Sequence, residues 1–399
     1  MSDVKIFAKV IEVEAREQIE ILSQQKSFCD QKIRIMPDVH AGKGAVIGFT
    51  STMGRYIIPN IVGVDIGCGM LTIELGKREI NLQKLDAVIR EHIPSGRNVH
   101  IGRTCKFEKM QKLKCYRELK DTKRLERSIG TLGGGNHFIE VCADDEGNKF
   151  LVIHTGSRNL GKQVAEYYQN LAHDLLCGKD KLLVEQEELI AEYKAQGRRN
   201  ELQKAIKQLR SKYKAQDSGI PKDLAYLTGK YKDDYLCDMA ICQEYAVLNR
   251  HHIGRIILEQ MGLVEEDFPS FETIHNYIDI ESNIIRKGAI DASHGKMVLI
   301  PLNMRDGCIV AIGKGNPDWN NSAPHGAGRI MSRMKAKATF TMEQYKESMR
   351  GVFTTSVCKD TLDELPMAYK NMNDIIDVIG DTVYIVKIVK PLYNYKASE

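Results

Sequence analysis

Residues 57–75 read IIPNIVGVDIGCGMLTIEL, in which short β-branched and apolar runs are broken by glycine. The preceding residues 34–53, RIMPDVHAGKGAVIGFTSTM, repeat this pattern. Runs of this kind predict strands that are joined by tight loops. Because a rigid sheet often holds binding and catalytic residues on such loops, we expect functional side chains in this region.

Similar strand-and-glycine segments recur along the chain and alternate with helical ones. Short strands are predicted within 131–160, in KMVLIPLN and CIVAIGKG within 283–315, and in the closing TVYIVKIVKPLYNYK. Three segments are predicted to be mainly helical: 5–27, 163–250 and about 341–378. No linker separates these segments, so we expect one domain over residues 1–399, of the α/β class with α+β mixed sheets.

Residues of about 178–218 predict an insertion into this domain, in the form of a helical hairpin. Four apolar residues within it recur at i, i+4, i+7 and i+11 and so share one helix face: Leu202, Ile206, Leu209 and Tyr213. Gly197 and the polar residues that follow it supply the turn. A packing appendage explains this segment more simply than a catalytic role does.

The composition excludes several classes of protein. Hydrophobic residues make up 43% and charged residues 28% of the 399, values typical of globular proteins rather than of disordered or collagen-like chains. No apolar run approaches the roughly 18–20 residues that cross a bilayer, so no membrane partner is expected. The first residues carry early acids and lack an apolar core, which predicts that there is no signal peptide and that the location is cytoplasmic.

The charge and the cysteines each leave two interpretations open. The net charge of +4 is too balanced to indicate a nucleic acid partner by itself. Within residues 103–127, however, ten Lys or Arg stand against four acids, which fits either a solvated helix face or a patch that contacts a polyanion. The ten cysteines include no C-x-x-C pair, and we interpret them as reduced thiols or single metal ligands.

The loop within 63–69, GVDIGCG, carries the strongest local signal for a metal site. Asp65 and Cys68 are three residues apart between glycines, so both side chains can turn toward one point. A carboxylate beside a thiolate is a plausible pair of metal ligands. Taken alone, this signal is weak, because a buried structural cysteine is the commoner role for such a residue.

Three histidines strengthen the metal interpretation. His137, His154 and His275 each stand where a predicted strand meets a loop. With the Asp–Cys pair they supply five ligands, and two metal ions could share this set if the thiolate bridges them. Such a pair of ions with open positions is typical of phosphoryl chemistry. Imidazole, carboxylate and thiolate together favour Mn, Co or Zn over Mg or Ca.

A fourth histidine, His325, lies in the sequence HGAGR of residues 325–329. Small residues allow backbone N–H groups to approach an anion closely, so this turn is a candidate anion nest. A histidine beside such a nest is poised to attack phosphorus. The alternative is a simple glycine turn before a helix over 329–337.

Taken together, these segments resemble the RtcB-type RNA ligases. The resemblance rests on nine features in order: MPDVHAGKG (36–44), PNIVGVDIGCGM (59–70), GTLGGGNHFIE (130–140), HTGSR (154–158), HNY (275–277), RKGAI (286–290), HGAGR (325–329), PMAYK (366–370) and the C-terminal lysine, Lys396. They span nearly the whole chain. The resemblance implies an RtcB-like single catalytic domain that carries the inserted hairpin.

The resemblance also implies an activity. Members of this family join RNA ends that bear a 3′-phosphate or 2′,3′-cyclic phosphate to 5′-hydroxyl ends, and they use GTP and Mn²⁺. The implied nucleophile is His325, which would carry GMP and pass it to the RNA 3′-phosphate before the 5′-hydroxyl attacks and GMP leaves. A cyclic phosphate would first be opened by water. The biological setting would be RNA repair or tRNA splicing, and a need for an activating protein partner is left open.

The family's site residues carry over position by position. The ligands of two Mn²⁺ ions fall on Asp65, Cys68, His137, His154 and His275. The guanylate contacts fall on Asn136, His137, Phe138, Ile139, Glu140, His275, Asn276, Pro301, Leu302, Asn303, Met304, Cys308, His325, Gly326, Ala327, Gly328, Tyr369 and Lys396. Asp38 and His40 lie in a family motif and would orient water or the 5′-hydroxyl.

Some positions depart from the family pattern. The loop 301–306 replaces a glycine- and serine-rich loop, Cys308 stands where a serine is usual, and Pro324 precedes His325. These departures bear on guanylate binding. Two other functions stay open at this point: a metal-dependent phosphoesterase that opens cyclic phosphates without ligation, and a catalytically inactive RNA-binding paralog.

Overall fold

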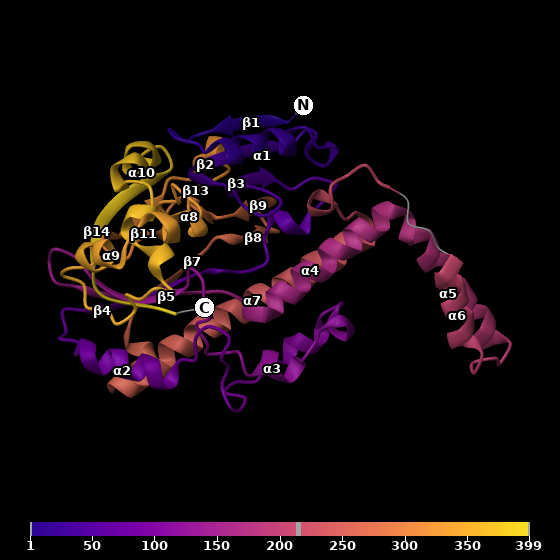
Figure 1. Ribbon diagram of the computed structural model, residues 1–399, viewed down its shortest axis with the longest axis horizontal. Helices are drawn as coiled ribbons and strands as arrows, with labels where there is room; N and C mark the ends of the chain where they lie inside the picture. The colour runs from indigo at the N-terminus through magenta and orange to yellow at the C-terminus, as the bar shows by residue number, and fades with distance from the viewer. Residues whose placement is uncertain (1, 213–216, 398–399) are drawn as a thin grey trace.

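The computed structural model describes residues 2–212 and 217–397 and has mixed α and β structure, as expected. Two curved sheets and a pair of long helices form the body of the molecule (Figure 1). Within the described residues, no helix combines the length and the apolar character that crossing a membrane requires.

The larger sheet has seven strands in the order β11-β12-β14-β5-β6-β4-β7, and every neighbouring pair is antiparallel. The strands are β4 (Gly69–Gly76), β5 (Phe138–Ala143), β6 (Lys149–Thr155), β7 (Ser270–Ile274), β11 (Met297–Asn303), β12 (Gly307–Gly313) and β14 (Val383–Lys396). The end strands meet, because the backbone N–H of Leu299 donates to Thr273 Oγ1 at 3.1 Å. The sheet therefore curls back on itself and encloses apolar side chains on its inner face.

The smaller sheet has five strands in the order β1-β2-β3-β9-β8, and only the β1–β2 pair is parallel. Its strands are β1 (Asp3–Ile6), β2 (Lys32–His40), β3 (Ile47–Thr52), β8 (Asn276–Asp279) and β9 (Ile284–Lys287). A separate pair, β10 (Ala289–Asp291) and β13 (Ser322–Pro324), follows it. β7 of the large sheet and β8 of the small one are separated by a single residue, His275, so the two sheets join there.

Most of the described helices pack around the two sheets, and two of them, α5 (Asp180–Ala195) and α6 (Leu202–Lys212), lie apart from the sheets (Figure 1). The others are α1 (Val13–Ser23), α2 (Leu82–His92), α3 (Thr122–Glu126), α4 (Arg158–Asp174), α7 (Gly229–Met261), α8 (Arg333–Thr339), α9 (Met342–Ser348) and α10 (Met372–Ile379). α4 and α7 pack side by side along the body (Figure 1). α7 ends at Gly262, whose φ of 80° is the left-handed conformation that commonly closes a helix.

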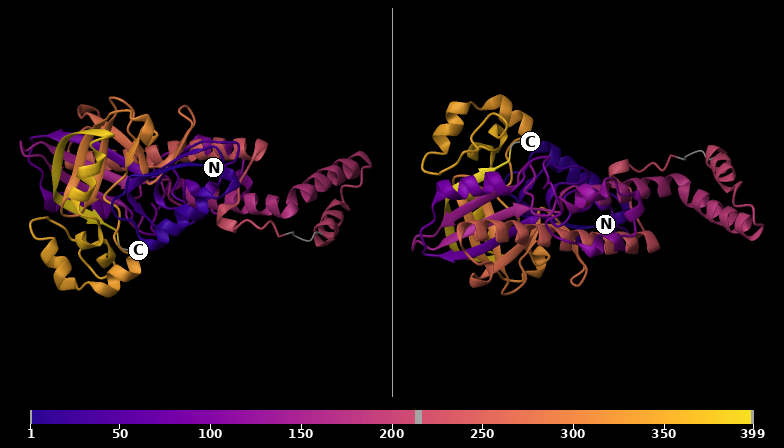
Figure 2. Two further views of the ribbon diagram at one scale, coloured as in Figure 1. Left: turned by 90° about the horizontal axis from the view of Figure 1, so that it is seen from above. Right: turned by 90° about the horizontal axis from the view of Figure 1, so that it is seen from below.

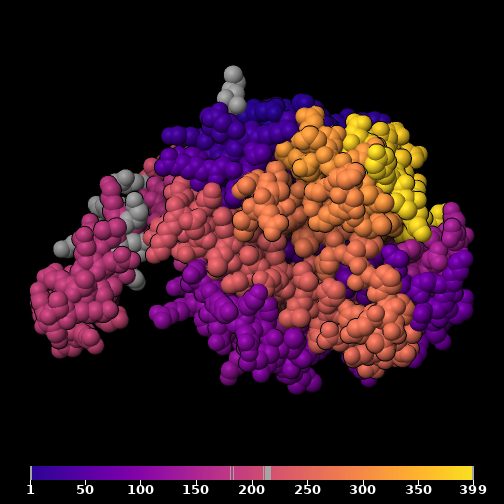
Figure 3. Space-filling view, turned by 180° about the vertical axis from the view of Figure 1, so that it is seen from behind, coloured from indigo at the N-terminus to yellow at the C-terminus, as the bar shows by residue number. Residues whose placement is uncertain are grey.

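Helices α5 and α6 form an arm that projects away from the body, as Figures 2 and 3 show from three sides. The two helices pack against each other, and residues 196–201 join them. Leu202, Ile206 and Leu209 lie on α6. The fourth residue of the predicted apolar face, Tyr213, lies outside the described residues.

The structure corrects three local predictions. The helix expected over 341–378 is two short helices, α9 and α10, because Gly351, Pro366 and several hydroxyl residues interrupt it with turns. Residues 5–27 start with a strand, and helix α1 occupies only part of the segment. Residues 103–127 form short turns and α3 rather than one helix face.

Candidate functional site

The five side chains that the sequence predicts as metal ligands converge at one place. Cys68 Sγ lies 3.5 Å from His137 Nε2 and 3.3 Å from His154 Nε2. Asp65 Oδ2 lies 2.9 Å from His137 Nε2, and the Nε2 atoms of His154 and His275 are 3.4 Å apart. Two triads therefore share one thiol, Asp65–Cys68–His137 and Cys68–His154–His275, and within each the donor atoms lie within 4.8 Å of one another.

Strand pairing brings these residues together from distant parts of the sequence. β4 lies between β6 and β7, and Cys68 immediately precedes β4. His154 lies near the end of β6, while His275 directly follows β7 and donates its backbone N–H to the Cys68 carbonyl at 3.0 Å. β5 pairs with the other side of β6, so His137, directly before β5, reaches the same edge of the sheet.

Two glycines allow the loop with Asp65 and Cys68 to take its shape. Gly67 has a φ of 72°, a left-handed conformation that side-chain-bearing residues rarely adopt. A Cβ there would also lie 2.9 Å from Gln243 Cα of α7. At Gly156, a Cβ would collide with the Asp65 carboxylate. The cluster therefore requires glycine at these two positions because a side chain would not fit there.

Two histidines of the cluster, His154 and His275, are in the neutral form that binds metal. Burial lowers the pKa of His154 and of His275 well below the usual range, so both rings are neutral. The Nδ1 atom of His137 lies 3.0 Å from the Leu132 carbonyl oxygen. A hydrogen bond between Nδ1 and that oxygen orients the ring so that Nε2 faces Asp65 Oδ2 and Cys68 Sγ, where a bound cation would take the place of an Nε2 proton.

Cys68 and Asp65 complete the donor set. Burial, together with the negative charge of Asp65, raises the pKa of the Cys68 thiol well above its usual value. Burial would also raise the pKa of Asp65, but the hydrogen bond from His137 and the nearby charges hold it below the usual range. Asp65 Oδ1 and the Nδ1 atoms of His154 and His275 are buried without a hydrogen-bond partner among the described residues.

This donor chemistry fits two cations that share one thiolate. Each of the two triads offers three donors, and Cys68 belongs to both. A cation beside the sulfur would offset the cost of ionising a buried thiol. Imidazole, carboxylate and thiolate donors together suit Mn, Co or Zn, in agreement with the expectation from the sequence.

His325 stands next to this cluster. The centroid of its ring lies 4.9 Å from that of His275. The fully buried Asp38 accepts two hydrogen bonds at Oδ2, from His325 Nδ1 at 2.6 Å and from the His325 backbone N–H at 3.1 Å. A carboxylate that accepts from Nδ1 holds the ring so that Nε2 is the nitrogen available to attack phosphorus.

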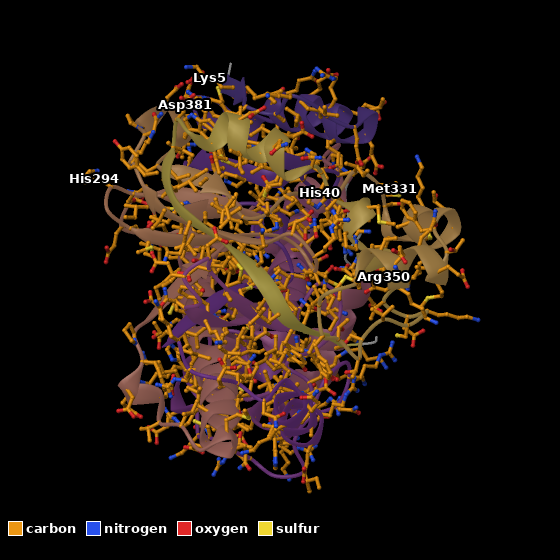
Figure 4. All side chains as sticks on the ribbon, turned by 90° about the vertical axis from the view of Figure 1, so that its left-hand side faces the viewer. Lys5, His40, His294, Met331, Arg350 and Asp381 are labelled. Atoms are coloured by element: carbon orange, nitrogen blue, oxygen red, sulfur yellow. The ribbon has the colours of Figure 1, made fainter. Side chains whose placement is uncertain are left out.

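A cavity of about 550 Å³ opens over His325, His154 and His275. Its wall also contains most of the residues that the sequence predicts as guanylate contacts: Asn136, Phe138, Glu140, Asn276, Pro301, Leu302, Asn303, Met304, Cys308, Gly326, Ala327, Gly328, Tyr369 and Lys396. His40 and Met331, both labelled in Figure 4, belong to the same wall. The volume lies in the range of small-molecule sites and can hold a nucleotide.

Glu364 organises two of the predicted guanylate contacts. Its Oε2 accepts from the Tyr369 hydroxyl at 2.6 Å, and Lys396 Nζ forms an ion pair with the same carboxylate. Burial would raise the pKa of Glu364, but the charges of Lys396, Arg333 and Arg329 hold it at about 2. Glu364 is therefore ionised and orders this part of the cavity wall.

Glu140 is a second buried carboxyl group of the cavity wall. It is 2% exposed, and its Oε2 accepts from Asn394 Nδ2 at 2.5 Å. Burial raises its pKa to about 7, against the hydrogen bonds from Cys142, Asn394 and Cys308. Glu140 can therefore exchange a proton near neutral pH and can accept a hydrogen bond from a buried ligand.

Three sequence expectations fit this geometry less well. The side chain of Ile139 lies on the other face of β5 from that of Glu140 and packs into the core between the sheet and the helices. In the candidate anion nest, the Ala327 N–H already donates to the Pro301 carbonyl at 3.1 Å. The helix expected to begin at residue 329 begins at Arg333.

Among the residues of the cavity wall that sequence reasoning did not assign to the site are Glu364, Asn394 and Lys287. Lys287 is buried and donates through Nζ to the carbonyl oxygens of Lys43, Ala45 and Asn60 at 2.6, 3.0 and 3.0 Å. Burial lowers its pKa to about 7. The only available signal was its position in the segment RKGAI, and no local pattern marks the other two.

Comparison with known proteins gives one family. A sequence model described as tRNA-splicing ligase RtcB matches residues 21–121 and 101–397. The chain is 30% identical to the RNA-splicing ligase RtcB of Escherichia coli strain K12, over 98% of this chain and 97% of that protein. It is 27% identical to the tRNA-splicing ligase RtcB of Nanoarchaeum equitans, over 97% of this chain and 93% of that protein. It is 26% identical to the tRNA-splicing ligase RtcB of Aeropyrum pernix, over 86% of this chain and 83% of that protein.

Proposed function

The chain belongs to the RtcB family of RNA-splicing ligases, and from that premise we propose that it is a GTP-dependent RNA ligase that uses His325 as its nucleophile. Its substrates are RNA ends with a 3′-phosphate or 2′,3′-cyclic phosphate and RNA ends with a 5′-hydroxyl, in RNA splicing or repair. One observation carries the mechanism: His325, oriented by Asp38, lies beside five side chains that could bind metal, and three of them, Asp65, His154 and His275, line the same cavity as His325.

His325 acts first. Its Nε2 forms a bond to the α-phosphorus of GTP, the bond from that phosphorus to the bridging oxygen breaks, and pyrophosphate leaves. Asp38 holds the Nδ1 proton of the ring during this attack, because its Oδ2 accepts from Nδ1 at 2.6 Å. A charge-assisted hydrogen bond of this kind also stabilises the positive charge that develops on the ring.

The RNA reacts next. An oxygen of the 3′-phosphate attacks the phosphorus of the GMP group, and the bond to His325 breaks. The 5′-hydroxyl then loses its proton and attacks the RNA phosphorus, which forms the phosphodiester and releases GMP. A cyclic phosphate is opened by water to the 3′-phosphate before these steps. GMP serves as a leaving group that a bare 3′-phosphate lacks.

Two manganese ions would be held by Asp65, Cys68 and His137, and by Cys68, His154 and His275. When bound, they supply Lewis-acid charge that neutralises phosphoryl oxygens and lowers the pKa of water. The neutral histidines and the unpartnered Asp65 Oδ1 support this assignment.

Guanine recognition falls to the other part of the cavity wall. Glu140 is placed to accept hydrogen bonds from the guanine edge, and Glu364 holds Lys396 and Tyr369 in position beside it. An ionised acceptor in a buried pocket rejects a base that lacks matching donors, because the acceptor would be left unpaired. This arrangement supports binding of GTP in preference to ATP.

The whole chain acts as one ligase domain, into which residues of about 178–218 insert the α5–α6 hairpin. The arm projects away from the body (Figure 2), and none of its described residues belongs to the cavity wall. Replacing it with a short flexible linker from the end of α4 to residue 219 should leave ligation of short RNA substrates unchanged.

The variant His325→Ala tests the mechanism. It should form no covalent GMP adduct with labelled GTP and should not seal 3′-phosphate ends. It should still seal RNA that carries a preformed 3′-guanylyl end, since the metal-binding side chains remain. Labelling by GTP in this variant would place the nucleophile elsewhere.

His294→Ala serves as the control, because His294 lies at the edge of the molecule (Figure 4) and outside the cavity wall. It should keep adduct formation and sealing. If the unaltered protein opens cyclic phosphates but neither takes up GMP nor seals RNA, the protein is a phosphoesterase. If it binds RNA without any of these reactions, it is an inactive paralog.

A further inference from the structure

Behind the wall of the cavity lies a second group of metal-binding side chains, formed by Glu140, Cys142 and Cys308. The thiol of Cys142 donates to Glu140 Oε1 at 2.8 Å, and that of Cys308 lies 3.7 Å from the same oxygen. All three donor atoms lie within 4.8 Å of one another. The residues are 2%, 0% and 1% exposed.

The sheet fixes this group. Glu140 and Cys142 are two residues apart on β5, so their side chains share one face. Cys308 lies on β12, on the far side of the intervening strand β14. Because Glu140 and Cys308 belong to the cavity wall, a small cation can reach the group from the cavity.

The two thiols are not placed for a disulfide. Cys142 is opposite Pro391 and Cys308 is opposite Val389, on the two sides of β14. Strands are about 4.8 Å apart, which separates the two Cα atoms by roughly 9–10 Å. A disulfide needs Cα atoms no more than about 7 Å apart, so the pair can share a ligand but cannot bond without backbone movement.

From this geometry we propose that Glu140, Cys142 and Cys308 form a third metal site, separate from the two-ion cluster, that binds a thiophilic divalent cation such as Zn²⁺. Two sulfurs and one carboxylate oxygen are donors that zinc prefers in tetrahedral sites. On binding, each thiol releases one proton to solvent and both sulfurs bind as thiolates.

The fourth tetrahedral position has a candidate donor. Asn394 Oδ1 is buried and finds no hydrogen-bond partner among residues 2–212 and 217–397, while its Nδ2 donates to Glu140. Asn394 also belongs to the cavity wall, so either its amide oxygen or a water molecule from the cavity can complete the site. The positive charge of Lys396 acts on Glu140 and would favour the resulting negative cluster.

Occupation of this site has a consequence that rests on the proposed function. Glu140 is the acceptor assigned to guanine, and a carboxylate bound to zinc cannot accept those hydrogen bonds equally well. Zinc at the third site therefore opposes GTP binding. The ion would act as an inhibitor that is distinct from zinc replacing manganese in the two-ion cluster.

The direct test measures bound metal, not activity. The variant Cys142→Ser keeps a hydroxyl that can donate to Glu140 but removes one zinc ligand. After dialysis against zinc, it should contain one equivalent less zinc per chain than the unaltered protein. The control Cys242→Ser alters an equally buried cysteine of α7 and should lose none. Equal zinc in the unaltered protein and in Cys142→Ser would overturn the proposal.

Absorption by bound Co²⁺ gives an independent test of the third metal site. In a Cys68→Ala background, which removes the shared thiolate of the two-ion cluster, added Co²⁺ should still produce sulfur-to-cobalt charge-transfer absorption. Adding Cys142→Ser should reduce that absorption by the contribution of one thiolate. Absence of the band in a folded Cys68→Ala protein would overturn the third site.

The consequence for GTP is measured separately. With manganese in excess, zinc should raise the GTP concentration needed for half-maximal adduct formation at least tenfold in the unaltered protein, and less in Cys142→Ser. Equal inhibition of both proteins would overturn the link to guanine. A protein that binds the extra zinc but never forms an adduct would refute the ligase assignment and leave the metal site standing.

Discussion

The pairing of Asp38 with His325 gives the sharpest test of the nucleophile. Asp38 Oδ2 accepts from both the backbone N–H and Nδ1 of His325, whereas Asp38 Oδ1 is buried without a partner among the described residues. In Asp38→Asn, the backbone N–H requires an acceptor, so the amide oxygen should occupy the Oδ2 position and the amide nitrogen the Oδ1 position. The tautomer of His325 should therefore be kept.

The size of the effect follows from this geometry. Asp38→Asn loses only the charge of the acceptor, which lowers the strength of the hydrogen bond from about 1.5–3 to about 0.5–1.5 kcal/mol. A loss of about 1–1.5 kcal/mol slows adduct formation by roughly 5- to 15-fold. Asp38→Ala removes both hydrogen bonds and leaves a buried N–H unpaired, so we expect a loss of at least about 100-fold.

The assay is single-turnover transfer of label from GTP to the protein, with bound metal measured in parallel. Asp238→Asn is the matched control, because Asp238 is also fully buried and accepts from Tyr168 and from two backbone N–H groups away from the cavity. The reasoning fails if Asp38→Asn slows adduct formation as much as Asp38→Ala does, or if neither variant slows adduct formation.

Three further predictions concern metal, pH and RNA. Cys68→Ala should lose both ions by metal analysis, whereas His154→Ala should lose at most one; two ions retained in Cys68→Ala would contradict a shared thiolate. Because the pKa of Glu140 is raised from 4.5 to about 7, its contribution to stability is full below the lower value and declines as pH rises toward 7. In urea unfolding, the free energy of unfolding of the unaltered protein should decline by up to about 3 kcal/mol over this pH range, and that of Glu140→Gln should not. Parallel pH profiles for the two proteins would contradict this prediction. RNA affinity should fall with salt by a log–log slope of roughly −0.7 per phosphate contacted, and a flat titration would exclude an electrostatic interface.

The sequence predicted the cluster well because each ligand lies in a short segment with its own signal. Asp65 and Cys68 stand in one glycine-rich loop, and the histidines stand at strand ends. Strand ends that meet at one edge of a sheet bring such residues together whatever the lengths of the connections between them. The pattern suggested both the set of donors and a thiolate shared between two ions, and Cys68 is the residue that lies in both triads.

Some residues of the cavity wall, such as Glu364, carry no local signal in the sequence. Glu364 acts through Lys396 and Tyr369, and its own neighbourhood in the sequence is a series of short turns. Nothing local distinguishes it from a surface glutamate until β14 brings Lys396 beside it. The error over 341–378 has the same origin: apolar residues there pack under turns and imitate a helical pattern.

The positions of His137 and Glu140 along β5 indicate the direction in which a bound nucleotide would lie. His137 of the two-ion cluster directly precedes the strand, and Glu140 follows three residues later, which corresponds to roughly 10 Å along the strand. His325 packs against His275 at the cluster end. In the proposed reaction, a guanylate attached to His325 would have its phosphate near the side chains that could bind metal, and its base could extend toward Glu140 and Lys396 in the same cavity wall.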